Sequence, residues 1–115
     1  MTKKLLLGAL ALLALAGCDR EDPAVVEARA QKMQPASPQL AEIWQRACRN
    51  CHIVRDSGAP MAGDAAAWQP RLAQGMDVLT QHAMQGFKNM PARGLCPDCT
   101  EADFRALIAF MSAKP

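Results

Sequence analysis

The five residues Cys48-Arg49-Asn50-Cys51-His52 decide how this chain is interpreted. Two cysteines separated by two residues and followed at once by a histidine form the C-x-x-C-H pattern. This spacing places the thiols one helical turn apart, where they can add to the two vinyl groups of a haem as thioethers. The histidine is then positioned to coordinate the haem iron. The pattern predicts one covalently bound haem, attached through Cys48 and Cys51, with His52 as an iron ligand.

Amphipathic helices are predicted on both sides of this motif. One helix begins at Ser37, a hydroxyl N-cap, and leads directly into the C-x-x-C-H residues. Its apolar positions follow helical spacing and are Leu40, Ile43, Trp44 and Ala47. Further helices are expected after Asp64, over 75–85, and after Thr100, which with Asp103 matches a capping box. No alternating apolar pattern is long enough for a strand, so the sequence predicts an all-α fold.

Length and charge exclude several classes of protein. A chain of 115 residues forms one domain, and 50% apolar residues are too many for a disordered chain. The chain carries 13 basic and 11 acidic side chains, and two of the basic ones, Lys3 and Lys4, lie in a segment that we expect to be removed. A nucleic-acid-binding protein needs a concentrated basic surface, which this balance does not supply.

Residues 1–17 are predicted to be a lipoprotein signal peptide. Two lysines precede an uncharged apolar run over 5–16, which is too short to span a bilayer as a stable helix. The run ends in Leu15-Ala16-Gly17-Cys18, which resembles a bacterial lipobox. Lipidation of Cys18 gives the odd one of five cysteines a role. The alternative is ordinary secretory cleavage at Ala14-Leu15-Ala16.

The segment 18–37 is predicted to be a lipid-anchored tether that precedes a folded domain over 38–115. Prolines at 23, 35 and 38 interrupt this segment. A helix over 24–34 is an alternative, but its apolar face is narrow, so the preferred interpretation is a plain flexible spacer. A flexible chain of this length has a root-mean-square reach of about 25 Å. We therefore expect the folded domain to be anchored through Cys18 on the periplasmic side of a bacterial membrane.

The cysteines also allow other chemistries. Cys48, Cys51, Cys96 and Cys99 form two C-x-x-C pairs, the outline of a four-cysteine zinc site. The two pairs lie much further apart in sequence than in a compact zinc ribbon, and zinc would leave His52 without a role. A thioredoxin-like redox role for Cys96 and Cys99 lacks the βαβ context which that motif requires.

A haem iron needs a second ligand on its other face. Among the methionines, Met90 stands out because it lies in a loop with glycines at both ends and directly precedes a proline. A proline pushes the residue before it into an extended conformation and denies the loop a helical hydrogen bond. Met61, Met76 and Met84 also remain as candidates, and His82 would give bis-histidine ligation instead.

The order of these motifs resembles that of a class I c-type cytochrome. The C-x-x-C-H motif is followed by Gly58-Ala59-Pro60, by the Met-Pro loop and by a terminal helix, and the resemblance covers about residues 39–113. Cys96-Pro97-Asp98-Cys99, just before that helix, resembles the cytochrome c-five subgroup. The resemblance implies a small cytochrome c domain over 38–115, with four or five helices around one haem c and its iron.

The resemblance also implies roles for individual residues. It makes Met90 the iron ligand opposite His52. It makes the carbonyl of Pro60 the acceptor for the second ring nitrogen of His52, a contact that fixes the ring and raises its basicity. It also implies a short disulfide between Cys96 and Cys99.

A cytochrome of this kind carries single electrons between redox proteins, such as membrane reductases or oxidases, and is not an enzyme. With two axial ligands bound, the iron offers no open position to a substrate. Lys88 and Arg93 flank Met90, and three roles are open for them: orienting an acidic partner, neutralising the haem propionates, or lying as ordinary solvated charges. The alternative is a haem enzyme or gas sensor, which requires a labile sixth ligand.

Overall fold

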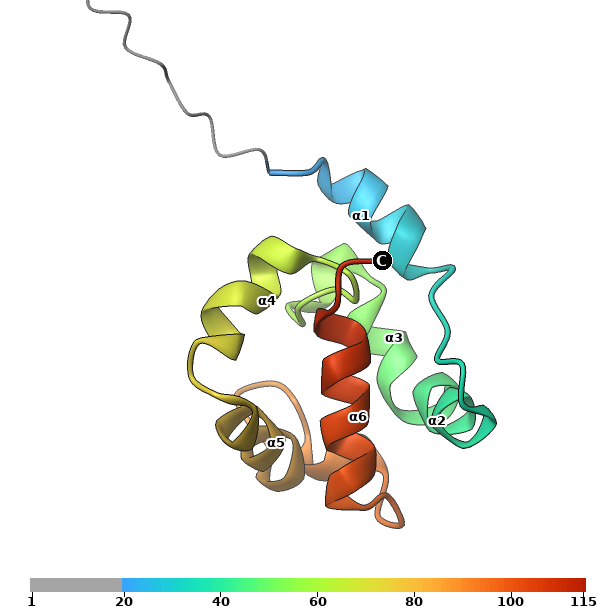
Figure 1. The fold of residues 1–115 in the computed structure, drawn as a ribbon, viewed down its shortest axis with the longest axis vertical. Coiled ribbons are helices and arrows are strands. Elements are labelled where there is room, and N and C mark those ends of the chain that lie inside the picture. The colour runs from blue at the N-terminus through green and yellow to red at the C-terminus, as the bar shows by residue number, and fades with distance from the viewer. Residues whose placement is uncertain (1–19) are drawn as a thin grey trace, which may run out of the picture.

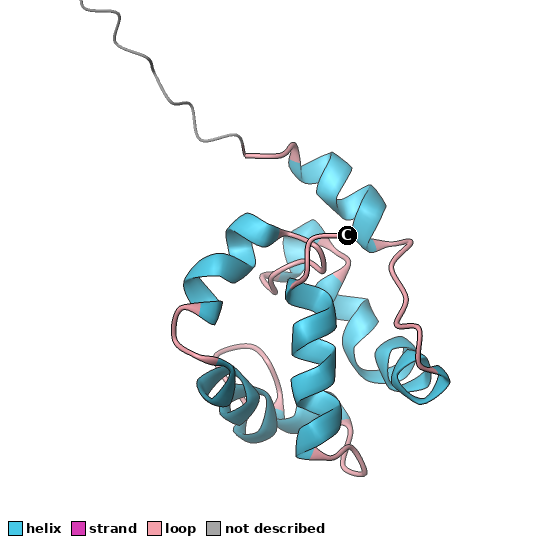
Figure 2. Ribbon diagram, viewed as in Figure 1, coloured by secondary structure: helices cyan, strands magenta, loops and turns pink. Residues whose placement is uncertain are grey.

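Every regular element in residues 20–115, the part of the chain that this computed structural model describes, is helical (Figure 2). The α-helices are α1 (Pro23–Ala30), α2 (Pro38–Ile43), α3 (Arg49–His52), α4 (Ala65–Leu72), α5 (Met76–Gln85) and α6 (Glu101–Ser112). Single turns of π or 3-10 type are η1 (Trp44–Cys48), η2 (Arg55–Ser57) and η3 (Ala92–Leu95). The predicted all-α fold is confirmed, whereas the predicted signal peptide and Cys18 lie outside the described residues.

Helix α6 forms the centre of the fold, with α4 and α5 on one side of it and α2 and α3 on the other (Figure 1). Its N-terminus has the predicted capping box. The Thr100 hydroxyl accepts a hydrogen bond from the Asp103 backbone, and the Asp103 carboxylate accepts one from the Thr100 backbone. The predicted apolar face is buried and consists of Phe104, Leu107, Ile108 and Met111.

Helices α2 and α3 are joined through η1 into one continuous helical segment. The predicted N-cap is confirmed, because the Ser37 hydroxyl accepts a hydrogen bond from the Leu40 backbone. Trp44 is completely buried, and its ring meets that of Phe110 edge to face, with ring centroids 5.2 Å apart. This segment therefore ties the C-x-x-C-H residues directly to the hydrophobic core.

Helices α4 and α5 follow as a pair. Asp64 caps α4 by accepting a hydrogen bond from the Ala67 backbone, as its position before the helix predicts. Pro70 lies inside α4, which continues to Leu72, so this proline does not end the helix. Trp68 on α4 is buried, and α5 begins directly after Gly75.

The prediction that 18–37 is a plain flexible tether is wrong for the described part of that segment. Helix α1 forms there, capped by the Asp22 carboxylate, and it buries Val26 and Ala30 against the domain. After α1, the Trp44 indole donates a hydrogen bond to the Met33 carbonyl (3.1 Å). Two buried apolar residues, together with polar contacts to the domain, hold this segment, so it docks without a broad apolar face.

None of the helices within residues 20–115 combines the length and the apolar character that crossing a membrane requires.

Candidate haem-binding site

The two cysteines of the C-x-x-C-H motif have free thiols and lie at the end of η1 and in α3. Cys51 is exposed, and Cys48 is partly buried. Burial raises the pKa of the Cys48 thiol to about 11, so this thiol is protonated at neutral pH. The π-helical turn η1 was not predicted. A wider turn rotates the residues after it around the helix axis, and such turns recur at functional sites.

His52 is held in one ring orientation by a backbone carbonyl. Its Nδ1 lies 2.8 Å from the Pro60 oxygen, and the residue is 7% exposed. Because a carbonyl only accepts, Nδ1 carries the hydrogen and Nε2 keeps its lone pair. Burial lowers the pKa of His52, although the Pro60 hydrogen bond partly opposes this effect. The result is a neutral imidazole with one nitrogen available to a metal.

The loop after His52 folds back onto it at two further points. The Ala62 backbone donates to the His52 carbonyl (2.7 Å). The Trp68 indole donates to the Met61 carbonyl (2.8 Å), and its ring stacks beside the imidazole with centroids 6.1 Å apart. Met61 itself is buried, as expected for an apolar packing residue.

The loop that carries Met90 is closed by a tight turn. The backbones of Phe87 and Met90 exchange two hydrogen bonds, of 3.0 and 2.9 Å. The Met90 side chain is partly buried and packs against the hydrophobic core. The following turn η3 lies against η1, so the segment after Met90 is brought beside the segment that ends in Cys48.

His82, the alternative candidate for the iron ligand, lies in a more exposed environment than His52. Its ring stacks face to face on Phe87, with centroids 3.9 Å apart and planes 9° apart. Phe87 is 43% exposed, so this stacked pair lies at the surface of the domain.

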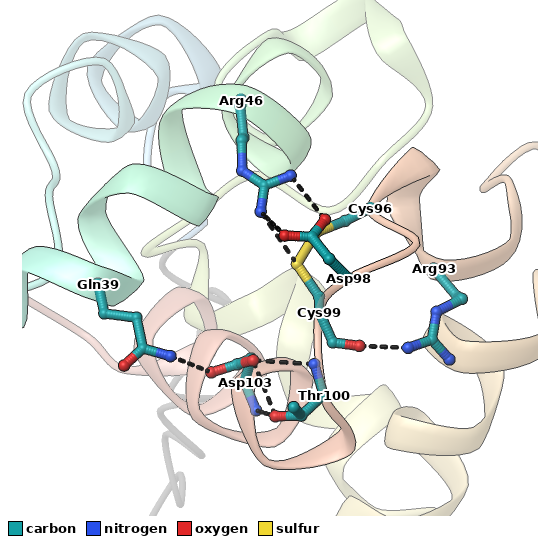
Figure 3. A network of polar contacts seen from close by, with 8 residues as sticks. All are labelled: Gln39, Arg46, Arg93, Cys96, Asp98, Cys99, Thr100 and Asp103. Carbon is teal, nitrogen blue, oxygen red and sulfur yellow. Dashed lines mark hydrogen bonds and ion pairs between the residues drawn. A yellow bond between two sulfur atoms is a disulfide. The ribbon is translucent and has the colours of Figure 1, made fainter.

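Cys96 and Cys99 are joined by a disulfide and are both buried, at the N-terminal end of α6 (Figure 3). The disulfide uses two of the four cysteines, which rules out the four-cysteine zinc alternative. The donors of Cys96, Asp98 and Cys99 lie close together, but the two sulfurs are bonded to each other and not free for a metal.

Two arginines connect this disulfide loop to its surroundings, and sequence patterns gave no sign of either contact (Figure 3). Arg46, on η1, forms two hydrogen bonds with the Asp98 carboxylate, of 3.1 and 2.7 Å. Arg93 donates to the Cys99 carbonyl, and its guanidinium lies over the Phe104 ring. Arg93 therefore points into the domain, which removes it as a free charge for a docking partner.

The donor set fits a covalently attached haem. It comprises two free thiols one helical turn apart, a neutral imidazole with an open Nε2 and a partly buried thioether. Thiols supply thioether bonds, and imidazole with thioether is a ligand pair that haem iron accepts in cytochromes c.

Comparison with known proteins agrees with this donor set. The model of the family described as cytochrome c oxidase, cbb3-type, subunit III matches residues 35–111. Cytochrome c-555 of Chlorobaculum thiosulfatiphilum is 38% identical over 72 residues, which cover 59% of this chain and 84% of that protein. Cytochrome c5 of Ectopseudomonas mendocina is 37% identical over 73 residues, which cover 62% of this chain and 84% of that protein.

A solved structure is also similar. A cytochrome c chain from the crystal structure of an electron transfer complex of nitrite reductase with cytochrome c superposes with a TM-score of 0.58 and 38% sequence identity. The alignment covers 66% of this chain and 93% of that one. The chain therefore belongs to this family of c-type cytochromes, which are small electron-transfer proteins with covalently bound haem c and not enzymes.

The backbone of the Met90 loop predicts a selective effect of a methyl group at Gly86. Gly75 and Gly86 flank α5 with similar dihedrals, φ 96° and 88° with ψ 147° at both. A Cβ at Gly86 would lie 3.1 Å from the Ala92 nitrogen. A Cβ at Gly75 would have no other atom within 4 Å beyond its own and the adjacent residues. We expect each alanine variant to lose about 1–3 kcal/mol through backbone strain, and Gly86→Ala to lose about 1 kcal/mol more.

Denaturant unfolding of the haem-loaded variants measures this difference. Gly75→Ala is the matched control, because it carries the same backbone strain without the close contact. Equal losses of unfolding free energy in the two variants would contradict the expectation.

Proposed function

We propose that this chain is a monohaem cytochrome that carries single electrons between redox proteins on the periplasmic side of a bacterial membrane. In this proposal Cys48 and Cys51 hold the haem as thioethers, and His52 and Met90 are the axial ligands. The bound haem iron supplies the one-electron couple. The sequence contains one C-x-x-C-H motif, which supports a single haem.

The orientation of His52 is the observation that carries the proposal. Its Nδ1–H donates a hydrogen bond to the Pro60 carbonyl, and burial lowers the pKa of the ring. The imidazole is therefore neutral, and the lone pair of Nε2 is available to the iron. A ligand ring that is fixed before the electron moves needs little rearrangement when the iron changes charge. The two free thiols lie in the same short helical segment as this ring.

Met90 is the better candidate for the second ligand. Its thioether packs at the edge of the core in a loop with a closed turn, whereas the His82 imidazole is stacked on Phe87 at the surface. A soft thioether favours reduced iron and raises the reduction potential relative to a second imidazole. Two firmly held ligands leave the protein to transfer electrons and not to bind substrate at the metal.

The surface around the Met90 loop is suited to a weakly bound partner. Phe87 and Leu95, on either side of Met90 in the chain, are 43% and 79% exposed. Lys88 is also exposed, and its ammonium lies 5.3 Å from the centre of the Phe87 ring. Apolar side chains beside a positive charge favour an acidic redox partner that docks briefly. The similar cytochrome from the nitrite reductase complex supports a protein partner of the redox class.

The lipid anchor at Cys18 is part of the same proposal. Covalent haem attachment takes place outside the cytoplasm, and the apolar run before Cys18 is typical of an exported lipoprotein. We therefore propose a signal peptide over 1–17, lipidation at Cys18 and a cytochrome domain over 38–115. The linker between anchor and domain includes the docked helix α1.

Acid extraction of the pigment tests the covalent attachment. The wild-type protein is expected to keep its haem in acidified organic solvent and to give a pyridine haemochrome spectrum of the thioether type. Replacing both Cys48 and Cys51 with alanine removes the covalent bonds, so any haem that is bound enters the solvent. The control replaces the other C-x-x-C pair, Cys96 and Cys99, and keeps the pigment on the protein. Release of pigment from the wild type would refute the proposal.

Paired variants at Met90 and His82 test the second ligand. Oxidised cytochromes with methionine bound to iron have a weak near-infrared charge-transfer band. We expect Met90→Ala to lose this band and to bind carbon monoxide rapidly when reduced, because the sixth position is open. We expect His82→Ala to keep the band. A wild-type protein without this band, with rapid carbon monoxide binding in His82→Ala and not in Met90→Ala, would assign the position to His82.

The intact mass of the mature protein tests the anchor. The expected mass is that of a chain that begins at Cys18 and carries diacylglycerol on sulfur, with the protein in the membrane fraction. Cys18→Ser cannot be lipidated in this way and is expected to leave that fraction. An unmodified chain that begins at Gly17 would contradict lipidation and favour ordinary secretion.

A further inference from the structure

A strap formed by residues 21–33 is bound to the cytochrome domain, although it precedes the family match over 35–111. Within the strap, α1 packs beside η2, and its side chains Val26 and Ala30 are 2% and 0% exposed. Figure 1 shows α1 at the end of the domain where the C-terminus lies. The strap therefore lies outside the matched residues and packs beside the loop that follows His52.

Arg29 connects the strap to the loop that follows His52. Its Nη2 donates to the Gly63 carbonyl (3.1 Å), and Glu21 holds the same guanidinium through two hydrogen bonds of 2.8 Å. Its Nε is buried and has no hydrogen-bond partner among the described residues. The guanidinium thus lies between the strap and the loop, and its hydrogen bond to the Gly63 carbonyl joins the two.

Gly63 is the point where the strap, the loop and α6 meet. Its φ is +77°, and its N–H donates to the Met111 carbonyl (2.7 Å). A Cβ at this position would lie 2.9 Å from the Met33 sulfur, so the strap and the loop are in direct contact at Gly63.

Glu27 holds the other part of the same loop. One carboxylate oxygen accepts from the Arg55 backbone N–H (3.2 Å), and the other lies 3.5 Å from the Arg55 guanidinium. Pro60 lies between Arg55 and Gly63 in the chain. The strap therefore holds the loop on both sides of the carbonyl that orients His52.

We propose that the strap is a positioning element for the iron ligand and that Arg29 is its main positioning residue. By holding the 53–63 loop, Arg29 and Glu27 keep the Pro60 carbonyl on the Nδ1–H of His52. This inference rests on the proposed role of His52 as axial ligand. A ring N–H that is buried and hydrogen-bonded exchanges with solvent only when the structure opens locally, so the strap sets how often this hydrogen bond opens.

Exchange of the His52 Nδ1–H with solvent, followed by NMR in the reduced haem-loaded full chain, tests the inference. The variant is Arg29→Gln, and the matched control is Lys32→Gln. Both remove one positive charge from the strap, but Lys32 is exposed and its side chain has no hydrogen bond or ion pair within the described residues. We expect exchange about tenfold faster in Arg29→Gln and unchanged in Lys32→Gln. Arg29→Lys keeps one charged donor, and its exchange rate is expected to lie between those of the wild type and Arg29→Gln.

The outcomes separate this inference from the proposed function. Equal exchange in Arg29→Gln and the wild type overturns the positioning role while leaving His52 as ligand. A wild-type His52 ring without the upfield shifts of a haem-bound imidazole overturns the ligand assignment itself, before any variant is compared. If Arg29→Gln does not accumulate as folded protein, Glu27→Ala tests the other contact, and unchanged exchange in that variant also overturns the inference.

Discussion

The hydrogen bond from His52 Nδ1 to the Pro60 carbonyl is the constraint on which the arrangement of the site depends. It fixes which ring nitrogen carries the hydrogen. It also requires the loop after His52 to fold back, so that the Pro60 carbonyl lies beside the imidazole. That return brings Trp68 beside the imidazole and leads directly into α4. The orientation of the imidazole and the path of the chain are therefore set by the same contact.

Much of the fold follows from local chemistry that a sequence displays. The caps at Ser37, Asp64 and Thr100 lie where their side chains predict, because each cap accepts a hydrogen bond from the backbone three residues later. The apolar face of α6 likewise follows from helical spacing. The Pro60 carbonyl lies where the resemblance to class I cytochromes implies, within hydrogen-bond distance of His52.

The missed features depend on contacts between residues far apart in the chain. Docking of the strap uses the carbonyls of Gly63 and Met33 as acceptors, and no residue type marks a carbonyl that will be used in this way. Arg93 looks like a docking charge beside Met90, but its left-handed backbone conformation turns it toward Cys99 and Phe104. The π-helical turn Trp44–Cys48 has no residue pattern of its own, and both Trp44 at its start and His52 just after it are buried.

The docking of α1 has a consequence for how a membrane-bound form of this protein would meet its partners. Only five Cα–Cα steps separate Cys18 from Pro23, the first residue of α1, and even a fully extended chain of that length spans about 18 Å. A lipid at Cys18 would thus keep the domain next to the bilayer surface and restrict its tilt. Exchange of electrons would then depend on lateral diffusion in the plane of the membrane, with partners whose docking faces lie close to the lipid headgroups.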